Sequence, residues 1–457
     1  MPNAASRLGP RVVVAGTSSG SGKTTVATGL MAALARRGLV VGAAKVGPDF
    51  VDPGYHALAT GRPSRNLDSW MCGATSVGPL AGRASAGADV LVVEGVMGLF
   101  DGSGDPEGPT ASTAEAAGLL DAPIVLVVDG SAVGASVAAM VHGFATFDRS
   151  VDVAGVVLNR VAGDSHEEML RSAVAATGVP VLGALRRDPR LAWRDRHLGL
   201  VPVVERPDDV RRSLAPLAAA VERYCDVDAI LALARGASTL SVAAPPLARH
   251  QARVRVAVAA GGAFSFVYPD NLEALEQAGA EIVPFDPLSD RYLPEDADAL
   301  YAGGGFPECF AKGLAANRSM LADVRARVGA GLVSWAECGG LLWLARTLDG
   351  RALAGAVPAE AAMTDRLTLG YRRARFRVDN PLGPAGTEVR GHEFHYSQLS
   401  PRGDALDWRG RSGTGIGGFA SPTLLASYVH LHLAADPSLA ERFVAAAAGK
   451  LSRPRSS

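Results

Sequence analysis

Short apolar runs separated by longer helical stretches constrain the fold of this chain most. In the first half, runs rich in Val, Leu and Ile alternate with Ala-, Leu- and Arg-rich stretches whose apolar residues recur with helical spacing. Strands that are apolar along their whole length are typical of parallel sheets covered by helices on both faces. The pattern therefore predicts an α/β fold. The expected strands of the first half are residues 12–15, 40–44, 90–93, 124–128 and 153–158.

The length of the chain predicts more than one domain. Its 457 residues exceed the roughly 250–300 residues at which a single hydrophobic core stops growing. Residues 236–252 contain Ser, Ala and a Pro–Pro pair, a composition that is typical of a linker. We therefore predict an N-terminal domain of residues 1–235, a linker of residues 236–252 and a C-terminal domain of residues 253–445.

The second half repeats the α/β pattern and then departs from it. Short strands are expected at residues 254–259, 281–284, 299–301 and 331–334. From about residue 367, Arg, Phe and Tyr alternate in the manner of antiparallel strands. The C-terminal domain should therefore be α/β with an antiparallel part.

Charge and hydropathy exclude several classes of partner. The chain has 45 Lys and Arg against 46 Asp and Glu, so a broad positive surface for nucleic acid or anionic membrane is not expected. Gly, Ser and His interrupt the longest uncharged run, residues 130–147, which favours an ordinary helix over a membrane span. The first apolar run, residues 12–15, is too short for a signal segment. We expect a cytoplasmic protein.

The four cysteines are scattered, with neither the paired spacing of a metal site nor a disulfide framework. For each of them, a small buried apolar side chain is the default interpretation. Only Cys338 has a sequence context that argues for another role. The four are Cys72, Cys225, Cys309 and Cys338.

A Gly-rich loop between a predicted strand and a helix at residues 26–36 predicts phosphate binding. Glycines let backbone N–H groups face an anion, and the helix N-terminus adds partial positive charge. Lys23 would reach the terminal phosphates, and the Thr24 hydroxyl would ligate magnesium. The first glycine of the usual pattern stands one position early, because Thr17 occupies its place. The alternative is a Gly-rich turn before a helix. The predicted nucleotide-binding residues are Gly16, Thr17, Gly20, Ser21, Gly22, Lys23, Thr24 and Thr25.

Polar residues at the ends of other predicted strands support a nucleotide site. Loops at the carboxyl ends of parallel strands converge on one ligand, and Mg²⁺ prefers oxygen ligands. We predict that Thr24, Asp49 and Glu94 bind Mg²⁺, with a solvated loop position as the alternative for each acid. Asn159 follows the strand at residues 153–158 and either contacts the base or forms a turn. The residues expected near phosphate or substrate are Lys45, Asp49, Asp52 and Asp101.

Cys338 lies between a predicted strand, residues 332–335, and a helix, with Gly339 directly after it. A nucleophile on such a tight turn is exposed to substrate, and the helix N-terminus lowers the pKa of a thiol. The backbone N–H groups of Gly304 and Gly305, together with that of Gly339, would stabilise an oxyanion. This context predicts a thiol nucleophile.

A thiol nucleophile also needs a base, and four histidines are candidates. Among them, His430 follows the strand-like residues 425–429 near the end of the domain, from where a histidine can return to the cysteine in space. If that stretch is a strand, His430 and His432 point to the same face, and periodicity cannot choose between them. The candidates are His392, His395, His430 and His432.

The two halves resemble two known kinds of domain. The first half is similar to the P-loop domain of dethiobiotin-synthetase type, which shares the early glycine, and the second to a class I glutamine amidotransferase domain of the cobalamin-biosynthesis type. Their joined order, with residues 45–56 (KVGPDFVDPGYH) and 66–68 (NLD), resembles the cobyrinate or hydrogenobyrinate a,c-diamide synthase family. The resemblance covers nearly the whole chain.

This resemblance implies a reaction and assigns the residues. ATP would phosphorylate the a and c acetate side chains of a corrinoid, and ammonia released from L-glutamine would displace the phosphate. The Ala-Glu-Cys-Gly-Gly match makes Cys338 the nucleophile, and the Ser-Tyr-Val-His match makes His430 the base. The usual His-x-Glu pattern reads here as His430-x-His432, so the orienting carboxylate is missing at that position. For His392 and His395, a structural role in a strand is the alternative.

Other functions were weighed against this one. A P-loop partitioning ATPase would carry a Lys where this chain has Ser18, and would have no need of Cys338. Related synthases amidate the remaining corrinoid carboxylates or nickel sirohydrochlorin, and residues 45–56 argue against the first of these. The expected partners are ATP with Mg²⁺, L-glutamine and a corrinoid, without nucleic acid or membrane, and a homodimer is the oligomer that we consider.

Overall fold

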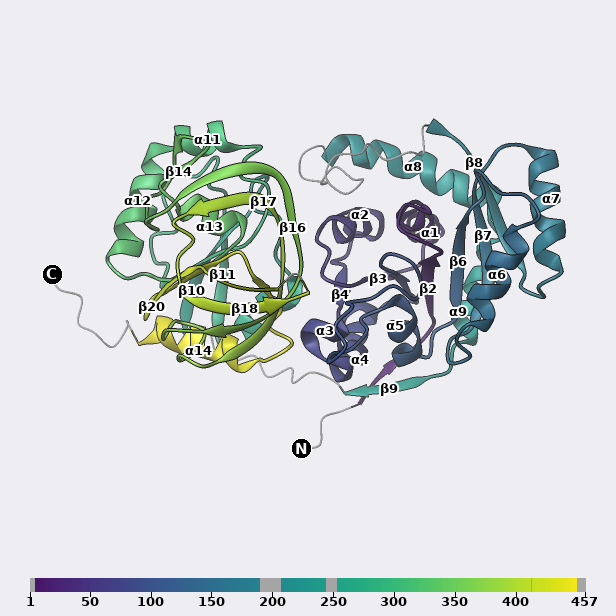
Figure 1. The fold of residues 1–457 in the computed structure, drawn as a ribbon, viewed down its shortest axis with the longest axis horizontal. Coiled ribbons are helices and arrows are strands. Elements are labelled where there is room, and N and C mark those ends of the chain that lie inside the picture. Colours follow the sequence, from purple (N-terminus) through teal and green to yellow (C-terminus); the bar gives the residue numbers. More distant parts are fainter. Residues whose placement is uncertain (1–4, 190–206, 244–252, 412, 450–457) are drawn as a thin grey trace. The chain divides into compact units, whose positions relative to one another are not determined.

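The computed structural model describes residues 5–189, 207–243, 253–411 and 413–449. The chain divides into two compact units, Met1–Pro246 and Leu247–Ser457, and each unit is described by itself (Figure 1). Both units are built on parallel strands with helices packed against them. The predicted α/β fold with two domains is confirmed.

The first unit contains a seven-stranded parallel sheet in the order β4-β3-β5-β2-β6-β7-β8. Its central strands are buried along their whole length, as the unbroken apolar runs predict. The five strands expected in this half are all present. The strands are β1 Ala5–Leu8, β2 Arg11–Gly16, β3 Val41–Val46, β4 Arg65–Leu67, β5 Val90–Glu94, β6 Ile124–Asp129, β7 Val153–Val161, β8 Val181–Arg186 and β9 Leu240–Ala243.

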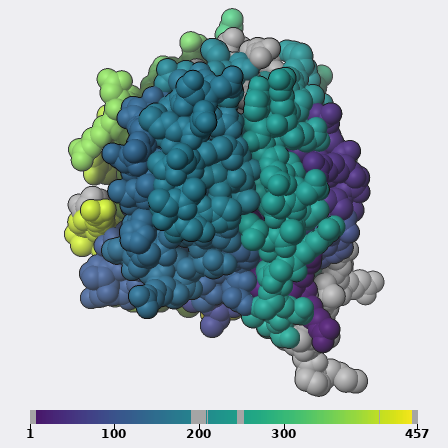
Figure 2. All heavy atoms as spheres, turned by 90° about the vertical axis from the view of Figure 1, so that its right-hand side faces the viewer, coloured from purple at the N-terminus to yellow at the C-terminus, as the bar shows by residue number. Residues whose placement is uncertain are grey.

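Helices pack against both the centre and the edge of this sheet. Helix α1 contributes a nearly continuous apolar surface to the core, and α8 and α9 pack against it and against β2 and β8. Figure 2 shows the edge of the unit, where the blue segment with α6 and α7 lies beside the green-teal band of α8 and α9. The helices are α1 Lys23–Arg36, α2 Val51–Thr60, α3 Ser69–Cys72, α4 Ala74–Ser85, α5 Thr113–Leu120, α6 Val137–Thr146, α7 Asp164–Ala175, α8 Pro207–Tyr224 and α9 Val227–Gly236.

The segment predicted as a linker begins with regular structure. Strand β9 pairs antiparallel with β1, from Leu8 opposite Leu240 to Ala5 opposite Ala243, so residues 240–243 belong to the first unit. Val242 of β9 is buried. Residues 244–252 of the expected linker lie outside the described residues.

The second unit has two sheets. The first, β11-β10-β12-β13-β21-β20, is parallel except for the antiparallel β20–β21 edge. In the second, β16 and β17 form the long antiparallel pair predicted from residue 367 onward. The strands are β10 Val254–Ala259, β11 Ala280–Phe285, β12 Ala299–Ala302, β13 Val333–Glu337, β14 Thr347–Leu348, β15 Arg351–Ala352, β16 Glu360–Phe376, β17 Glu388–Ser400, β18 Leu406–Gly410, β19 Gly413–Gly417, β20 Phe419–Ser421, β21 Leu424–Ser427 and β22 His430–Leu431.

Five described helices accompany these sheets. Helix α13 follows β13 directly, with Cys338 as the residue between them. Helix α14 packs its apolar face on the parallel sheet through Phe443, whose ring meets the ring of Trp335 edge-on. The helices are α10 Pro269–Gln277, α11 Ala311–Ala316, α12 Arg318–Gly329, α13 Gly339–Leu344 and α14 Ser438–Ala448.

The predicted strand at residues 425–429 needs correction. Strand β21 ends at Ser427, and the chain leaves the parallel sheet to form β22 beside β17 in the other sheet. His430 stands opposite His392 in this second sheet. Because the chain changes sheet between Ser427 and His430, His430 does not belong to the same strand as β21. Local periodicity in the sequence does not reveal such a change.

Two further expectations concern helices and cysteines. None of the helices in the described ranges combines the length and the apolar character that crossing a bilayer requires. The uncharged residues 130–147 contain helix α6, with Val137 and Val141 buried, as expected for an ordinary helix. Cys72, Cys225 and Cys338 are buried, but Cys309 is exposed, so the default interpretation was wrong for Cys309.

Candidate active sites

The phosphate loop lies between β2 and α1. Gly20 and Gly22 have φ angles of 79° and 98°, which favour glycine, and Lys23 is the first residue of the helix. The Lys23 ammonium donates to the Ser18 carbonyl at 3.1 Å, so it folds back over the loop. A side chain at Gly16 would meet Ser21 Oγ at 2.3 Å, which explains why a glycine stands at this early position.

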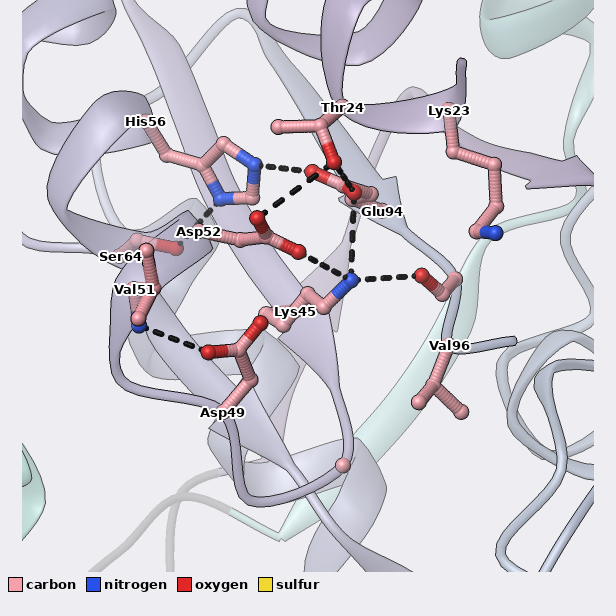
Figure 3. A network of polar contacts seen from close by, with 12 residues as sticks. Lys23, Thr24, Lys45, Asp49, Val51, Asp52, His56, Ser64, Glu94 and Val96 are labelled. Carbon is pink, nitrogen blue, oxygen red and sulfur yellow. Dashed lines mark hydrogen bonds and ion pairs between the residues drawn. The ribbon is translucent and has the colours of Figure 1, made fainter. Parts of the chain in front are cut away.

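A buried network of charged side chains adjoins this loop (Figure 3). Lys45 Nζ lies 2.7 Å from Asp52 Oδ2 and 3.2 Å from Glu94 Oε1. The Thr24 hydroxyl donates to Glu94 Oε1 at 2.6 Å and to Asp52 Oδ1 at 3.4 Å. His56 Nε2 lies 2.6 Å from Glu94 Oε2. The network joins residues from α1, β3, α2 and β5.

The charges in this network set one another's protonation. Burial alone would lower the pKa of Lys45, but Asp52 and Glu94 raise it above its ordinary value. Burial would raise the pKa of Glu94, but Lys45 and His56 hold it well below its usual range. The pKa of Lys23 is lowered to about 8, first by burial and then by the charge of Lys45. Glu94 therefore stays a carboxylate.

The structure places the other predicted residues of this site around the network. Asp49 accepts a hydrogen bond from the Val51 N–H at 2.7 Å, whereas Asp52 accepts one from the Thr24 hydroxyl at 3.4 Å. Asp52 therefore lies beside Thr24, while magnesium binding by Asp49 stays a prediction. Asp101 accepts from the Gly98 N–H at 2.8 Å.

Asn159 lies next to the phosphate loop. Its Nδ2 donates to the Ser21 carbonyl at 2.9 Å, and a Cβ at Gly22 would lie 1.9 Å from the same nitrogen. Asn159 thus braces the loop from the end of β7 in this structure. Contact with a base stays a prediction.

Sequence reasoning missed the role of His56 as a partner of Glu94. His56 is fully buried in α2, and its Nδ1 lies 3.1 Å from Ser64 Oγ. It had been noted only as the last residue of the segment at 45–56. The strand order brings it to Glu94, and a single polar residue in a helix carries no signal of that contact.

The second site lies at the turn between β13 and α13. Cys338 has φ 47° and ψ −100°, a strained conformation for a residue other than glycine, and it is buried. Its Sγ lies 3.6 Å from the Phe394 carbonyl of β17. The Gly340 N–H donates to the Gly303 carbonyl at 2.9 Å, which ties the turn to the glycine triplet. The predicted turn between strand and helix is present, but the thiol on it is buried and not exposed, and its role as nucleophile stays a prediction.

The predicted oxyanion donors need one correction. The N–H of Gly304 donates to the Phe266 carbonyl at 3.0 Å, in a reciprocal pair, so it is already used. A Cβ at Gly304 would lie 2.4 Å from His430 Cε1, and the glycine therefore makes room for the imidazole. A Cβ at Gly339 would lie 2.9 Å from the Gly305 nitrogen. Gly305 and Gly339 thus lie next to each other, and their N–H groups remain the candidate donors to the oxyanion.

The two neighbouring histidines have different surroundings. Burial would lower the pKa of His430, but the side chains of Cys338 and Glu337 raise it to about 10. His432 instead stacks on Tyr268 with ring centroids 4.6 Å apart, and its Nε2 lies 4.0 Å from Asp270 Oδ2. The expectation that both histidines approach one region was wrong, and His430 is the one beside the thiol.

Sequence reasoning also missed Glu337. This residue ends β13, directly before Cys338, and its side chain is 2% exposed. Its Oε2 lies 3.8 Å from His430 Nδ1. The glutamate is part of the Ala-Glu-Cys-Gly-Gly stretch, so the signal was present, but strand alternation suggests that adjacent residues face opposite ways.

The histidines of β17 lie close to His430. Burial, together with the charge of His430, lowers the pKa of His392 to about 3 and that of His395 to about 4, so both are neutral at pH 7. His395 stacks on Tyr428 with centroids 3.7 Å apart. Both residues belong to a strand, as the structural alternative for them stated.

Two family models match the chain, one in each half. Residues 12–200 match the CobQ/CobB/MinD/ParA nucleotide binding domain, and residues 255–438 match the CobB/CobQ-like glutamine amidotransferase domain. A hydrogenobyrinate a,c-diamide synthase of Streptomyces coelicolor is 50% identical over 95% of this chain and 97% of that protein. The chain belongs to the a,c-diamide synthase family.

Other relatives extend the comparison to both substrate names. A hydrogenobyrinate a,c-diamide synthase of Mycobacterium tuberculosis is 46% identical over 96% of this chain and 98% of the relative. A cobyrinate a,c-diamide synthase of Syntrophotalea carbinolica is 45% identical over 95% of this chain and 98% of the relative. The family resemblance stated from the motifs is confirmed, and with it the class of glutamine-hydrolysing carbon–nitrogen ligase.

Proposed function

We propose that this protein uses ATP and glutamine to convert the a and c acetate carboxylates of hydrogenobyrinate or cobyrinate into amides during cobalamin biosynthesis. The observation that carries the proposal is the presence, in one chain, of a phosphate loop beside a buried Lys–carboxylate network and a strained cysteine beside a histidine. The names of the most similar relatives support a corrinoid as the substrate.

In the first unit, the proposed step is formation of an acyl phosphate. A substrate carboxylate oxygen attacks the γ-phosphorus of ATP, the bond to the bridging oxygen breaks, and ADP leaves. Lys23 and the backbone N–H groups of the loop would bind the phosphates, and their positive charge would stabilise the charge that spreads over the transferred group. Lys45 holds Asp52 and Glu94 in place.

The oxygen atoms of Thr24, Asp52 and Glu94 fit a magnesium ion. The Thr24 hydroxyl oxygen lies 3.4 Å from Asp52 Oδ1 and 2.6 Å from Glu94 Oε1. Carboxylate and hydroxyl oxygens are ligands that this hard cation prefers. No group of three or more His, Cys, Asp and Glu side chains that could hold a metal occurs in the described part of the chain, so substrate phosphates and water would have to complete the shell. The bound ion would neutralise phosphate charge.

In the second unit, the proposed step is hydrolysis of glutamine. His430 takes the thiol proton as Cys338 Sγ attacks the side-chain amide carbon, and a carbon–sulfur bond forms. The N–H groups of Gly305 and Gly339 would face the oxyanion, and His430 passes a proton to the departing nitrogen as the carbon–nitrogen bond breaks. Water then cleaves the thioester to glutamate and restores the thiol. The ammonia attacks the acyl phosphate, and inorganic phosphate leaves as the amide forms.

The test is product analysis with the purified protein. It is incubated with ATP, Mg²⁺, glutamine and, in separate reactions, hydrogenobyrinate, cobyrinate and nickel sirohydrochlorin. Mass spectrometry should show two successive amidations of one or both corrinoids, each with release of one ADP and one glutamate. Amidation of nickel sirohydrochlorin alone, or ATP hydrolysis without any amide product, would contradict the proposed substrate.

A further inference from the structure

Glu337 is a buried carboxylate whose two oxygens have separate partners. Oε1 accepts the Leu431 N–H at 2.8 Å, and Oε2 accepts the Tyr301 hydroxyl at 3.0 Å. Oε2 also lies 3.8 Å from His430 Nδ1, and both side chains are nearly inaccessible to solvent. An ionised carboxylate is costly to bury unless hydrogen bonds and opposite charge compensate it. The surroundings of Glu337 supply both kinds of compensation.

We propose that Glu337 is the positioning carboxylate of the glutamine site, in place of the carboxylate that the His430-x-His432 pattern lacks. This inference rests on the proposed function, because it takes Cys338 as nucleophile and His430 as base. A carboxylate beside one imidazole nitrogen orients the ring and stabilises its protonated form. Glu337 would thus act through His430 and not on glutamine itself.

The strained turn at Cys338 explains how adjacent residues reach one imidazole. In a regular strand, consecutive side chains point to opposite faces. The φ of 47° at Cys338 ends β13 and turns the chain, so that Glu337 from the strand and Cys338 from the turn both contact His430. The strained turn therefore positions two side chains against His430, that of Cys338 and that of Glu337.

The backbone next to His430 is held on both sides. Glu337 bonds the Leu431 N–H, and Asn271 Nδ2 donates to the Leu431 carbonyl at 2.8 Å. Asn271 Oδ1 also accepts the Leu433 N–H at 2.7 Å. The same carboxylate that faces the imidazole therefore fixes the peptide that follows it, which limits movement of His430 relative to the thiol.

Other charged or titratable groups around His430 do not offer this arrangement. Glu393 of β17 pairs with Arg372 Nε at 2.8 Å, and His392 and His395 have lowered pKa values. Together with Cys338 and Glu337, these are the groups that act on His430 or respond to its charge. Asp270 lies by His432 instead.

The decisive variant is Glu337→Gln, which removes the charge and keeps the shape; the amide oxygen can still accept the Leu431 N–H, and the amide NH2 can donate to the Tyr301 hydroxyl oxygen. Glutaminase kcat should fall by at least about tenfold and by up to about ten-thousandfold, the loss that follows when the orienting carboxylate of a Ser-His-Asp triad becomes an amide. The KM for glutamine and the ammonia-dependent amidation should change little. The pH–rate limb of the imidazole should move to lower pH, because the carboxylate that raises the pKa of His430 is gone. A merely structural role would leave that limb in place.

Two further variants make the test specific. Asp270→Asn makes the same change beside His432 and should leave the limb unmoved. Tyr301→Phe keeps the ring stacked on Trp335 but removes a donor from Oε2, so the limb should move to higher pH. If Glu337→Gln does not fold, Tyr301→Phe still tests the proposal. An unmoved pH–rate limb in the Tyr301→Phe protein would contradict the role of Glu337.

The outcomes separate this inference from the proposed function. A wild-type rate and limb in Glu337→Gln, or a limb that moves only in Asp270→Asn, would overturn the role of Glu337 alone. Absence of glutamine hydrolysis in the wild-type protein, or full hydrolysis in Cys338→Ala, would instead overturn the glutaminase assignment. The pH dependence of the alkylation of Cys338 by iodoacetamide, compared between the wild-type protein and Glu337→Gln, is an independent measurement of the same shift.

Discussion

The phosphate-loop unit buries a lysine, a histidine and two carboxylates together, whereas the thiol unit buries one carboxylate beside a histidine and a cysteine. In the first, the Lys45 ammonium compensates the two carboxylates over distances of 2.7 and 3.2 Å. In the second, the backbone itself is unusual, with Cys338 at φ 47° and a Cβ at Gly305 excluded by the Ala263 carbonyl at 2.1 Å.

This difference indicates what each site needs in order to work. The phosphate site depends on charge balance, so the loss of one charge should affect ATP chemistry whatever the nitrogen source. The thiol site depends on the shape of a turn and on one imidazole. Its loss should stop the use of glutamine and leave the synthesis from free ammonia intact.

The largest expected effect separates the two sites completely. Cys338→Ala should abolish glutamine-dependent amidation, because no other thiol lies at the turn, while ammonium salts still support synthesis. Product formation is measured with each nitrogen source. Cys309→Ala, at an exposed cysteine, is the matched control and should retain both activities. Loss of ammonia-dependent synthesis in a folded Cys338→Ala protein would contradict the separation of the two sites.

The choice of base is tested with the two neighbouring histidines. A base contributes roughly a hundred- to ten-thousandfold, so His430→Ala should nearly eliminate glutamine hydrolysis and spare ammonia-dependent amidation. His432→Ala should keep a clearly measurable rate, because that ring packs on Tyr268. Glutamate release is the measurement. Equal losses would mean that the two histidines act as a unit, and a larger loss at His432 would transfer the role of base to it.

The charge balance of the first unit is tested by Lys45→Ala. Removal of this lysine leaves Asp52 and Glu94 buried without their common partner, and breaking a buried pair costs about 3–5 kcal/mol. Urea unfolding should show this loss in the free energy of unfolding. Lys312→Ala, at an exposed lysine, is the control and should be neutral within about 0.5 kcal/mol. Unchanged stability in Lys45→Ala would mean that the network is not a charge-balanced unit.

The phosphate loop is tested by Lys23→Ala. Loss of a charge that stabilises phosphoryl transfer costs several kcal/mol of barrier, so synthesis should fall on the order of a hundredfold or more with either nitrogen source. ADP release and amide formation are measured together. Near-normal ammonia-dependent rates would count decisively against a role for Lys23 in the ATP reaction.

A pH dependence of stability is expected in the second unit. His430 has a pKa raised from 6.5 to about 10 in the folded protein, so its stabilising contribution is complete below pH 6.5 and is lost as the pH rises through 10. The slope should approach about 1.4 kcal/mol per pH unit within that window. Urea unfolding followed by the fluorescence of Trp335 and Trp343 measures it. His430→Ala should flatten the slope, and an equal slope in both proteins would contradict a charged His430.

Much of the fold and part of each site could be predicted from contiguous sequence. The strand, loop and helix around Lys23 follow from an apolar run, glycines that accept positive φ and an Ala-rich stretch, all of which act between near neighbours. The turn at Cys338 follows in the same way from a strand, two glycines and a short helix. Its assignment as nucleophile still awaits its test.

Contacts between distant residues were predicted less well, because they depend on which strands become neighbours. Lys45 stands opposite Glu94 because β3 pairs with β5, and His56 reaches the same carboxylate from α2. Asp52 and not Asp49 accepts the hydrogen bond from Thr24, and no local pattern distinguishes two acids three residues apart.

The sequence by itself therefore determined the α/β class, the two units, the phosphate loop and the turn that carries Cys338, since each depends on interactions within one short segment. Only the tertiary structure decided that His430 leaves the preceding strand for another sheet, that Gly304 makes room for its ring, and that Glu337 faces it. These three features depend on the packing of segments that are far apart in the sequence, where hydrophobic burial and strand pairing select the neighbours.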